Sequence, residues 1–293
     1  MKPAANPATA VLLLAHGSPD SVDQVPEFLL RVTGGRPLPP EVVKEVQHRY
    51  GLIGRTPLTE LTLKQAGLLA RTAGLRVYVG MRNWKPYITD AVHAMVADGI
   101  THAVVICMAP QNSRTSVGLY RAALTAENPP FSIDFVESWH DQPLLIQAFA
   151  EKLRASRPAT PIIFTAHSVP QRTITDGDPY EQQAKETAAL VAKQAALAPE
   201  DWAFAFQSQG MSGGPWLGPT VEDTILGLKQ RGQRSVFIQP IGFLCDHVEV
   251  LYDIDIAFKQ FADKQGVQLA RAKSLNDSPL LAQALAAIVQ QRL

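Results

Sequence analysis

Short runs of Val, Ile and Leu, separated by longer segments of helical periodicity, restrict the fold of this chain more than any other feature. Each run is bounded by Gly, Pro or Ser, which is typical of buried parallel strands joined by helical crossovers. We therefore predict an α/β fold of parallel sheets flanked by helices. Strands are expected near Ala10–Leu14, Arg76–Val79, Ala103–Cys107, Phe131–Phe135, Pro161–Thr165, Ala203–Gln207 and Ser235–Ile238. Helices are expected over Leu61–Thr72, Tyr87–Asp98, Pro143–Ser156, Tyr180–Leu197, Val221–Arg231 and Pro279–Arg292.

The two halves of the chain resemble each other. Leu12–Pro19 has the same form as Ile163–Pro170, namely a buried strand that ends in Ala-His. Later in each half a strand leads to a loop with Trp and Pro, at Trp84–Pro86 and Trp216–Pro219, and then to a helix. An internal duplication predicts two similar parallel sheets that face each other, with the ligand cleft beyond the carboxyl ends of their strands.

The length of 293 residues fits two lobes, each able to bury its own core, and we place them at residues 1–155 and 156–293. The 27 basic and 27 acidic residues cancel without a block of like charge, so a small molecule is a better candidate partner than nucleic acid. Cys107 and Cys245 each lie in an apolar run, which fits reduced thiols in the cytoplasm. The region from Met1 to Thr9 is no export signal and no apolar run is long enough to span a membrane, so we expect neither export nor membrane insertion.

Two histidines lie where a ligand is expected. His167 follows the apolar run Ile162–Thr165, and His16 occupies the matching position in the first half. A histidine at the carboxyl end of a buried strand can offer a neutral nitrogen to a metal or take up a proton. A histidine packed against a backbone carbonyl is the alternative interpretation.

The segment Pro240–Asp253 places metal-capable groups among apolar residues. Burying Asp246, His247 and Glu249 together costs several kcal/mol unless they are paired or coordinated. If a helix begins near Asp246, that residue caps it, and Glu249 and Asp253 lie on one face. Alternatively, His247 packs and Glu249 is solvated, but the apolar neighbours of Glu249 favour a metal or acid–base role.

Further residues could line a ligand site. The loop Gly213–Pro219 combines glycines and prolines around Trp216, which suggests a rigid loop with an aromatic wall for a flat ligand or, alternatively, a packing loop. Arg49, Tyr50, Thr56 and Tyr120 offer charge and hydroxyl groups suited to carboxylates, or they lie on the surface. The usual motifs of nucleotide binding and serine hydrolysis are absent, so the residues alone indicate a cleft for metal or acid–base chemistry.

Four motifs resemble those of the ferrochelatase family in order and spacing: Thr165–Pro170, Gly177–Tyr180, Pro215–Pro219 and Asp246–Tyr252. The resemblance spans nearly the whole chain. It implies an enzyme that inserts ferrous iron into a porphyrin held between two Rossmann-like lobes, with His167 and Glu249 as the metal pair. Iron is then a substrate, and neither an organic cofactor nor an iron–sulfur cluster is expected, since the chain has no Cys-rich tail.

Within that family, the amino-terminal region resembles the coproporphyrin III enzymes of monoderm bacteria more than the membrane-associated protoporphyrin enzymes. The resemblance rests on Arg36-Pro37, Glu41, Arg49-Tyr50, Ile53-Gly54 and Pro57. It implies coproporphyrin III as substrate, with protoporphyrin IX as the alternative, and porphyrin contacts at Arg49, Tyr50, Thr56 and Tyr120. We add His16 and Trp216 to the expected porphyrin contacts, and we expect a monomer.

The chain departs from the pattern of those enzymes at three places. His16 stands where they usually carry a Tyr that ligates product iron, and we assign it as a third, axial metal ligand. Thr33 and Gly34 occupy a stretch where arginines are usual, and Ala257 replaces a third acidic residue on the helix after Glu249.

His16 also motivates two rival hypotheses. One is a cobalt or nickel chelatase acting on a sirohydrochlorin-like tetrapyrrole, because Ala-His-Gly-Ser resembles the start of such enzymes. The other is a haem carrier that catalyses no metal insertion, in which His16 is the axial ligand of haem and Glu249 is not needed for function. The long motifs around Trp216 and Glu249 favour the porphyrin enzyme over both.

Overall fold

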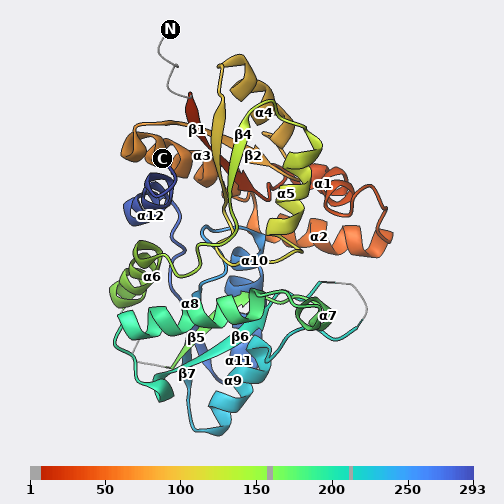
Figure 1. Cartoon of the computed structure of the whole chain (residues 1–293). Coiled ribbons are helices and arrows are strands. Elements are labelled where there is room, and N and C mark those ends of the chain that lie inside the picture. Colours follow the sequence, from red (N-terminus) through yellow and green to blue (C-terminus); the bar gives the residue numbers. More distant parts are fainter. Residues whose placement is uncertain (1–7, 157–160, 211–213) are drawn as a thin grey trace, which may run out of the picture.

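The computed structural model describes residues 8–156, 161–210 and 214–293 (Figure 1). It contains two sheets of four strands, and every paired strand is parallel. The first sheet consists, in spatial order, of β2 (Arg76–Met81), β1 (Thr9–Ala15), β3 (His102–Cys107) and β4 (Ser132–Val136). The second consists of β6 (Trp202–Gln207), β5 (Ile162–His167), β7 (Ser235–Pro240) and β8 (Gln268–Arg271). The predicted α/β class with two similar Rossmann-like lobes is confirmed.

The two sheets also share their topology. In each one, the first strand along the chain lies between the second and the third, and the fourth is at the edge. The loops after β2 and β6 match as well, because Met81 N–H donates to Pro86 O at 2.7 Å and Phe206 N–H donates to Pro219 O at 2.8 Å. These shared contacts support the internal duplication inferred from the sequence.

Helices cover both faces of each sheet, so the central strands are buried on both sides (Figure 1). Ala10–Leu14 of β1 has no exposed surface, which explains a continuous apolar run instead of an alternating one. The first lobe contains α1 (Val25–Val32), α2 (Pro40–Ile53), α3 (Leu58–Ala73), α4 (Ile88–Ala97), α5 (Val117–Ala126) and α6 (Pro143–Ser156). After β5 come α7 (Gln171–Thr175), α8 (Tyr180–Gln194), α9 (Val221–Gln230), α10 (Val248–Leu251), the π-helix Asp253–Phe258, α11 (Lys259–Lys264) and α12 (Pro279–Gln290).

All six helices expected from the sequence are present, and so are all seven expected strands. The sequence interpretation did not include α1, α2, α5, α7, α11 and β8. Tyr50 is the one buried residue among those described in α2, so this helix has little apolar stripe to reveal it. The strand β8 lies at a sheet edge with a half-exposed burial pattern, which leaves it without a buried run.

The lobes share one continuous core. It includes Val11 from the first sheet, Phe164 from the second and Leu285 from α12. The carboxy-terminal helix α12 packs against α3 and α6 (Figure 1). The proposed lobe boundary between residues 155 and 156 remains a prediction. The helix α12 belongs to the second half of the chain but packs beside the first lobe.

Three stretches of the sequence interpretation fall partly outside the described residues. These are the amino-terminal residues 1–7, residues 157–160 after the proposed lobe boundary, and residues 211–213, which include Gly213 of the proposed ligand wall. In the ranges that the structure describes, no helix is both long and apolar enough to cross a membrane.

Candidate active site

His167 is the last residue of β5 and is held on two sides. Its backbone carbonyl accepts a hydrogen bond of 2.9 Å from the Tyr180 hydroxyl, and its ring Nδ1 bonds to the carbonyl of Ser168. Because a carbonyl only accepts, Nδ1 carries a proton, and Nε2 is the nitrogen available for other chemistry. One third of the side chain remains exposed, so the ring is fixed but accessible.

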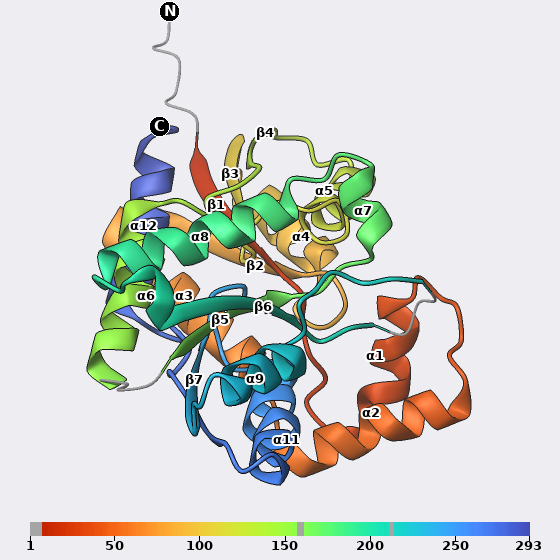
Figure 2. The ribbon, with the colours of Figure 1, turned by 90° about the horizontal axis from the view of Figure 1, so that it is seen from below.

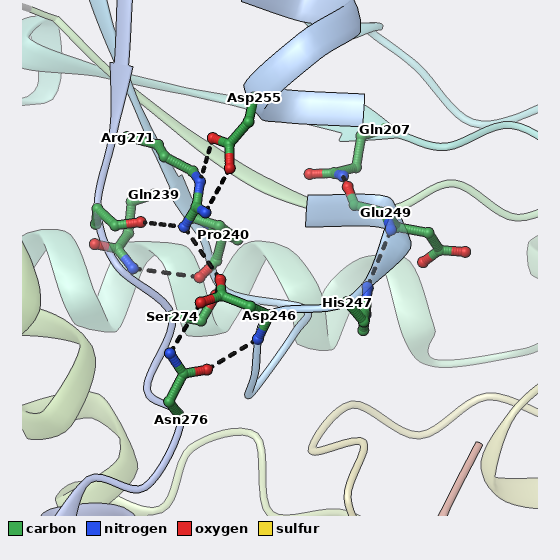
Figure 3. A network of polar contacts seen from close by, with 11 residues as sticks. Gln207, Gln239, Pro240, Asp246, His247, Glu249, Asp255, Arg271, Ser274 and Asn276 are labelled. Atoms are coloured by element: carbon green, nitrogen blue, oxygen red, sulfur yellow. Dashed lines mark hydrogen bonds and ion pairs between the residues drawn. The ribbon is translucent and has the colours of Figure 1, made fainter. Parts of the chain in front are cut away.

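Glu249 lies in the first turn of α10, and His247 is the residue that caps this helix. Its Nδ1 accepts a hydrogen bond from Glu249 N–H at 3.1 Å. The prediction that Asp246 caps the helix is therefore wrong, because Asp246 bonds elsewhere and the helix begins at Val248. The Gln207 side-chain amide donates to Glu249 O at 2.8 Å (Figure 3), so the backbone of Glu249 is held from both sides.

His167 and Glu249, 82 positions apart in the chain, meet directly. His167 Nε2 lies 3.3 Å from Glu249 Oε1. Burial by itself lowers the pKa of His167, but attraction and hydrogen bonding to Glu249 outweigh it and raise the pKa above its usual 6.5. Burial likewise raises the pKa of Glu249, and the His167 charge outweighs this and lowers it to about 2. At neutral pH, Glu249 is therefore ionised, and His167 holds a proton more readily than a free histidine.

The pKa of His247, which precedes Glu249 in the chain, is shifted in the opposite direction to that of His167. Burial lowers its pKa, and its Nδ1 is already an acceptor, so His247 is neutral with its proton on Nε2. Its ring stands edge-on to Phe243 at 4.6 Å between centroids, and Phe243 contacts the His167 ring in the same way at 6.4 Å. Phe243 thus separates two histidines in different charge states.

A half-buried polar network supports the segment that carries Glu249 (Figure 3). Arg271, at the end of β8, donates to Asp255 from Nε at 2.6 Å and from Nη2 at 2.7 Å, and to Asp246 from Nη1 at 3.2 Å. Asp246 also accepts hydrogen bonds from Ser274 and Asn276. Since Asp246 precedes Glu249 and Asp255 follows it, Arg271 fixes the segment on both sides of the carboxylate.

The helix after Glu249 contains a π-helical stretch, Asp253–Phe258, of a kind often found at functional sites. Asp253 begins it and accepts a hydrogen bond from the Ser208 hydroxyl. Burial raises the pKa of Asp253 to about 6, and the nearby Glu249 charge adds to this effect. Asp253 therefore titrates close to neutral pH beside a carboxylate that does not.

His16 matches His167 in local geometry but not in charge. It follows β1, and its Nδ1 donates to the Gly17 carbonyl at 3.0 Å, as His167 does to Ser168. Its ring contacts Phe28 edge-on at 5.7 Å. Desolvation lowers the pKa of His16, and no carboxylate among the described residues is hydrogen-bonded to it, so it stays neutral near pH 7.

The structure brings three of the expected porphyrin contacts near this site. Arg49 lies over the Tyr252 ring, 5.0 Å from its centroid, and its charge acts on Asp253. The Tyr50 hydroxyl is 3.2 Å from Ser18 Oγ, and Tyr50 and Tyr120 both experience the Glu249 charge. Figure 2 shows α1 and α2 together on one side of the molecule, and α2, which carries Arg49 and Tyr50, contacts α10.

Two further expected contacts, Thr56 and Trp216, have other surroundings. Thr56 is buried before α3, where its hydroxyl is 3.5 Å from Leu58 N. Trp216 is half-buried, pairs with Pro170 in a β-bridge and lines a surface hollow next to Gln171. Their roles in porphyrin binding remain predictions.

The metal set of His16, His167 and Glu249 remains a prediction in the same way. His16 is close enough for its charge to act on Glu249. In the part of the chain that the structure describes, however, no three His, Cys, Asp or Glu side chains converge into a group that could hold a metal ion. The His167–Glu249 pair therefore offers one nitrogen and one carboxylate as donors, a combination compatible with Fe(II) and other divalent transition metals.

Comparisons with known proteins show the family of this chain. The ferrochelatase family model matches residues 8–293. The chain belongs to the ferrochelatase family. Members of this family are enzymes of haem biosynthesis that insert metal into a porphyrin, with ferrous iron as the substrate metal. The resemblance seen in the sequence motifs is therefore confirmed.

Individual relatives cover nearly the full chain. A ferrochelatase of Acidobacterium capsulatum is 55% identical, and the alignment covers 97% of this chain and 94% of that protein. A coproporphyrin III ferrochelatase of Geobacillus kaustophilus is 36% identical, with 96% and 95% covered. The solved structure of SirB from Bacillus subtilis with Fe3+ has a TM-score of 0.61 and covers 97% of this chain and 94% of that one, at 12% identity. At that identity SirB supports the two-lobed fold alone.

Of the residues that shape the site, Tyr180 belonged to a motif noted in the sequence, whereas Gln207 and Arg271 were missed. Tyr180 was visible as the end of the Gly-Asp-Pro-Tyr motif, and Asp178 of this motif bonds to Ser113 and the Arg114 backbone of the first lobe. Gln207 and Arg271 gave no signal, since single polar residues at strand ends are common and their partners are far away in sequence.

Proposed function

We propose that this enzyme inserts Fe(II) into coproporphyrin III, with His167 and Glu249 as the residues that receive the metal. The observation that carries the proposal is the contact of 3.3 Å between His167 Nε2 and Glu249 Oε1, at the carboxyl end of β5 and one-third exposed. Ligands of parallel sheets bind at this end of the strands.

The charge state of the pair suits a metal that stays only briefly. Fe(II) replaces the proton shared between His167 and Glu249, because both donors must be unprotonated to bind it. Two donors leave coordination positions open, so the metal can pass to the four pyrrole nitrogens of the porphyrin. The two pyrrole protons are then released, and the unprotonated His167–Glu249 pair accepts one of them while the other passes to solvent.

Coproporphyrin III is supported by the chemistry around the pair and by one relative. Its propionates need cations and hydroxyl donors, and Arg49, Tyr50 and Tyr120 provide these near Glu249 and Asp253. The relative from Geobacillus kaustophilus is a coproporphyrin III ferrochelatase. We assign Thr56 and Trp216 to more distant porphyrin contacts and His16 to the axial position of the inserted iron. We further propose that the protein works as a monomer in the cytoplasm.

Anaerobic Fe(II) insertion followed by absorbance, with coproporphyrin III and protoporphyrin IX in separate reactions, tests this proposal. We expect faster turnover of coproporphyrin III and a loss of at least about 100-fold in kcat for His167→Ala. His93→Ala, an exposed histidine on α4, is the matched control and should retain full activity. Faster turnover of protoporphyrin IX would refute the substrate, and unimpaired insertion by a folded His167→Ala enzyme would refute the metal pair.

A further inference from the structure

Arg82 is a half-buried cation without an anion. It follows β2, and its backbone N–H donates to Ala15 O at 2.9 Å, which places it beside the His16 backbone. Within the described residues, its side chain makes no hydrogen bond or ion pair. Burial is the largest effect on Arg82 and lowers its pKa. A desolvated guanidinium in this state is costly, and binding an anionic ligand would offset the cost.

Arg271 shows what a satisfied arginine looks like in this chain. Burial would lower its pKa too, yet hydrogen bonds and attraction from Asp255 and Asp246 raise it. Arg82 has no such carboxylate among the residues that the structure places.

The groups around Arg82 are donors without partners. The charge of Arg82 acts on Tyr120 and His16. The Tyr120 hydroxyl forms no hydrogen bond with any residue in the described ranges, although Tyr120 is buried. Asn83 follows directly, is 1% exposed, and neither its amide nitrogen nor its amide oxygen has a partner among the described residues. The guanidinium of Arg82 and the hydroxyl of Tyr120 together fit a planar carboxylate.

We propose that Arg82 binds a propionate of the porphyrin, with the Tyr120 hydroxyl as a second donor. This inference rests on the proposed function, which brings a porphyrin to this site, and it extends that function to a residue on the first lobe. Coproporphyrin III carries a propionate on every pyrrole ring, so such a contact is available to it in each orientation. Arg82 is a positioning and specificity residue, and the chemistry stays with the His167–Glu249 pair.

Porphyrin binding without iron tests the contact directly. Quenching of porphyrin fluorescence gives Kd for coproporphyrin III and for its methyl ester, which lacks the carboxylate charges. We expect Arg82→Gln to weaken binding of coproporphyrin III on the order of 10- to 100-fold, because a hydrogen bond between charged groups is lost. Binding of the ester should be the same for the wild-type and Arg82→Gln proteins, and Arg82→Lys should restore part of the loss.

Controls separate this contact from a structural effect. Arg76→Gln removes an exposed arginine from the start of the same strand and should leave both Kd values unchanged. Equal weakening of the acid and the ester by Arg82→Gln would overturn the inference, and so would an unchanged Kd for coproporphyrin III. The proposed substrate fails by a different result, namely faster turnover of protoporphyrin IX by the wild-type enzyme.

Discussion

Acidification should weaken Fe(II) binding to the His167–Glu249 pair, because one proton competes with the metal. The Kd for Fe(II) should rise tenfold for each pH unit below the pKa of His167. The structure sets this number. Glu249 has a pKa of about 2 and is already ionised, while Nδ1 of His167 keeps its proton in the bond to Ser168. His247 is neutral because burial lowers its pKa. A single proton, on Nε2 of His167, therefore competes with the metal.

The same pair affects folding with a defined sign. The raised pKa of His167 means that its contribution is complete below the unfolded value of 6.5 and is lost as the pH rises through the folded pKa. The lowered pKa of Glu249 means that its contribution is complete above 4.5 and is lost as the pH falls towards about 2. The pair is thus most stabilising between about pH 4.5 and 6.5, where metal binding is impaired.

Anaerobic calorimetry of Fe(II) binding, repeated in buffers with different ionisation enthalpies, counts the protons released. We expect a value that approaches one below the pKa of His167 and falls towards zero above it. Asp253→Asn is the control, because Asp253, with a pKa of about 6, is the other group that titrates in this range. Release of two protons, or of none at pH 6, would contradict the assignment to His167. A count that falls to zero in Asp253→Asn well below the pKa of His167 would contradict it too, whereas a smaller count close to that pKa is expected, because the Asp253 charge helps to raise it.

Three further predictions concern the support of the pair. Glu249→Gln should lower the pKa of His167, because the charge that opposes the effect of burial is lost, and nuclear magnetic resonance of the labelled histidine ring measures this. Arg271→Met should cost about 2 kcal/mol in urea unfolding, since Asp255 loses both hydrogen bonds from Arg271 and Asp246 keeps only those from Ser274 and Asn276. Arg76→Met, which breaks an exposed pair, should cost at most about 0.5 kcal/mol. Gly242→Ala should cost about 1–3 kcal/mol and slow iron insertion, because its Cβ would lie 2.9 Å from a Cα of β5; an unchanged midpoint would contradict this.

The sequence predicted the elements that are buried on a regular repeat. The strand β1 lies inside the molecule along its whole length, so its apolar run is unbroken, and helices such as α3 and α9 alternate core and surface residues. Among the elements that escaped prediction, α2 has no such repeat, since Tyr50 is its one buried residue among those described, whereas α5 buries Val117, Tyr120 and Leu124 at helical spacing and was missed. The π-helix Asp253–Phe258 and the short helix α10 depend on Arg271 and His247, and neither interaction can be recognised from neighbouring residues.

The site was predictable as parts and not as an arrangement. Glu249 stood out because a carboxylate among apolar residues needs a partner, and His167 because it ends a buried strand. The sequence did not show which atoms meet. The cap formed by His247, which orients Glu249, and the half-buried guanidinium of Arg82, unpaired among the described residues, become visible only when β2, β5 and α10 are placed in space.

The duplicated fold presents two histidines in the same local geometry but shifts their pKa values in opposite directions. His16 directly follows β1, His167 is the last residue of β5, and each bonds through Nδ1 to the carbonyl of the next residue. The difference arises because Glu249 lies at 3.3 Å from one ring, while the other has Arg82 nearby. One histidine therefore holds a proton that a metal must displace, and the other offers a neutral nitrogen at the same pH. Duplication supplied two equivalent positions, and the charges placed around them by α10 and by the loop after β2 made the positions chemically distinct.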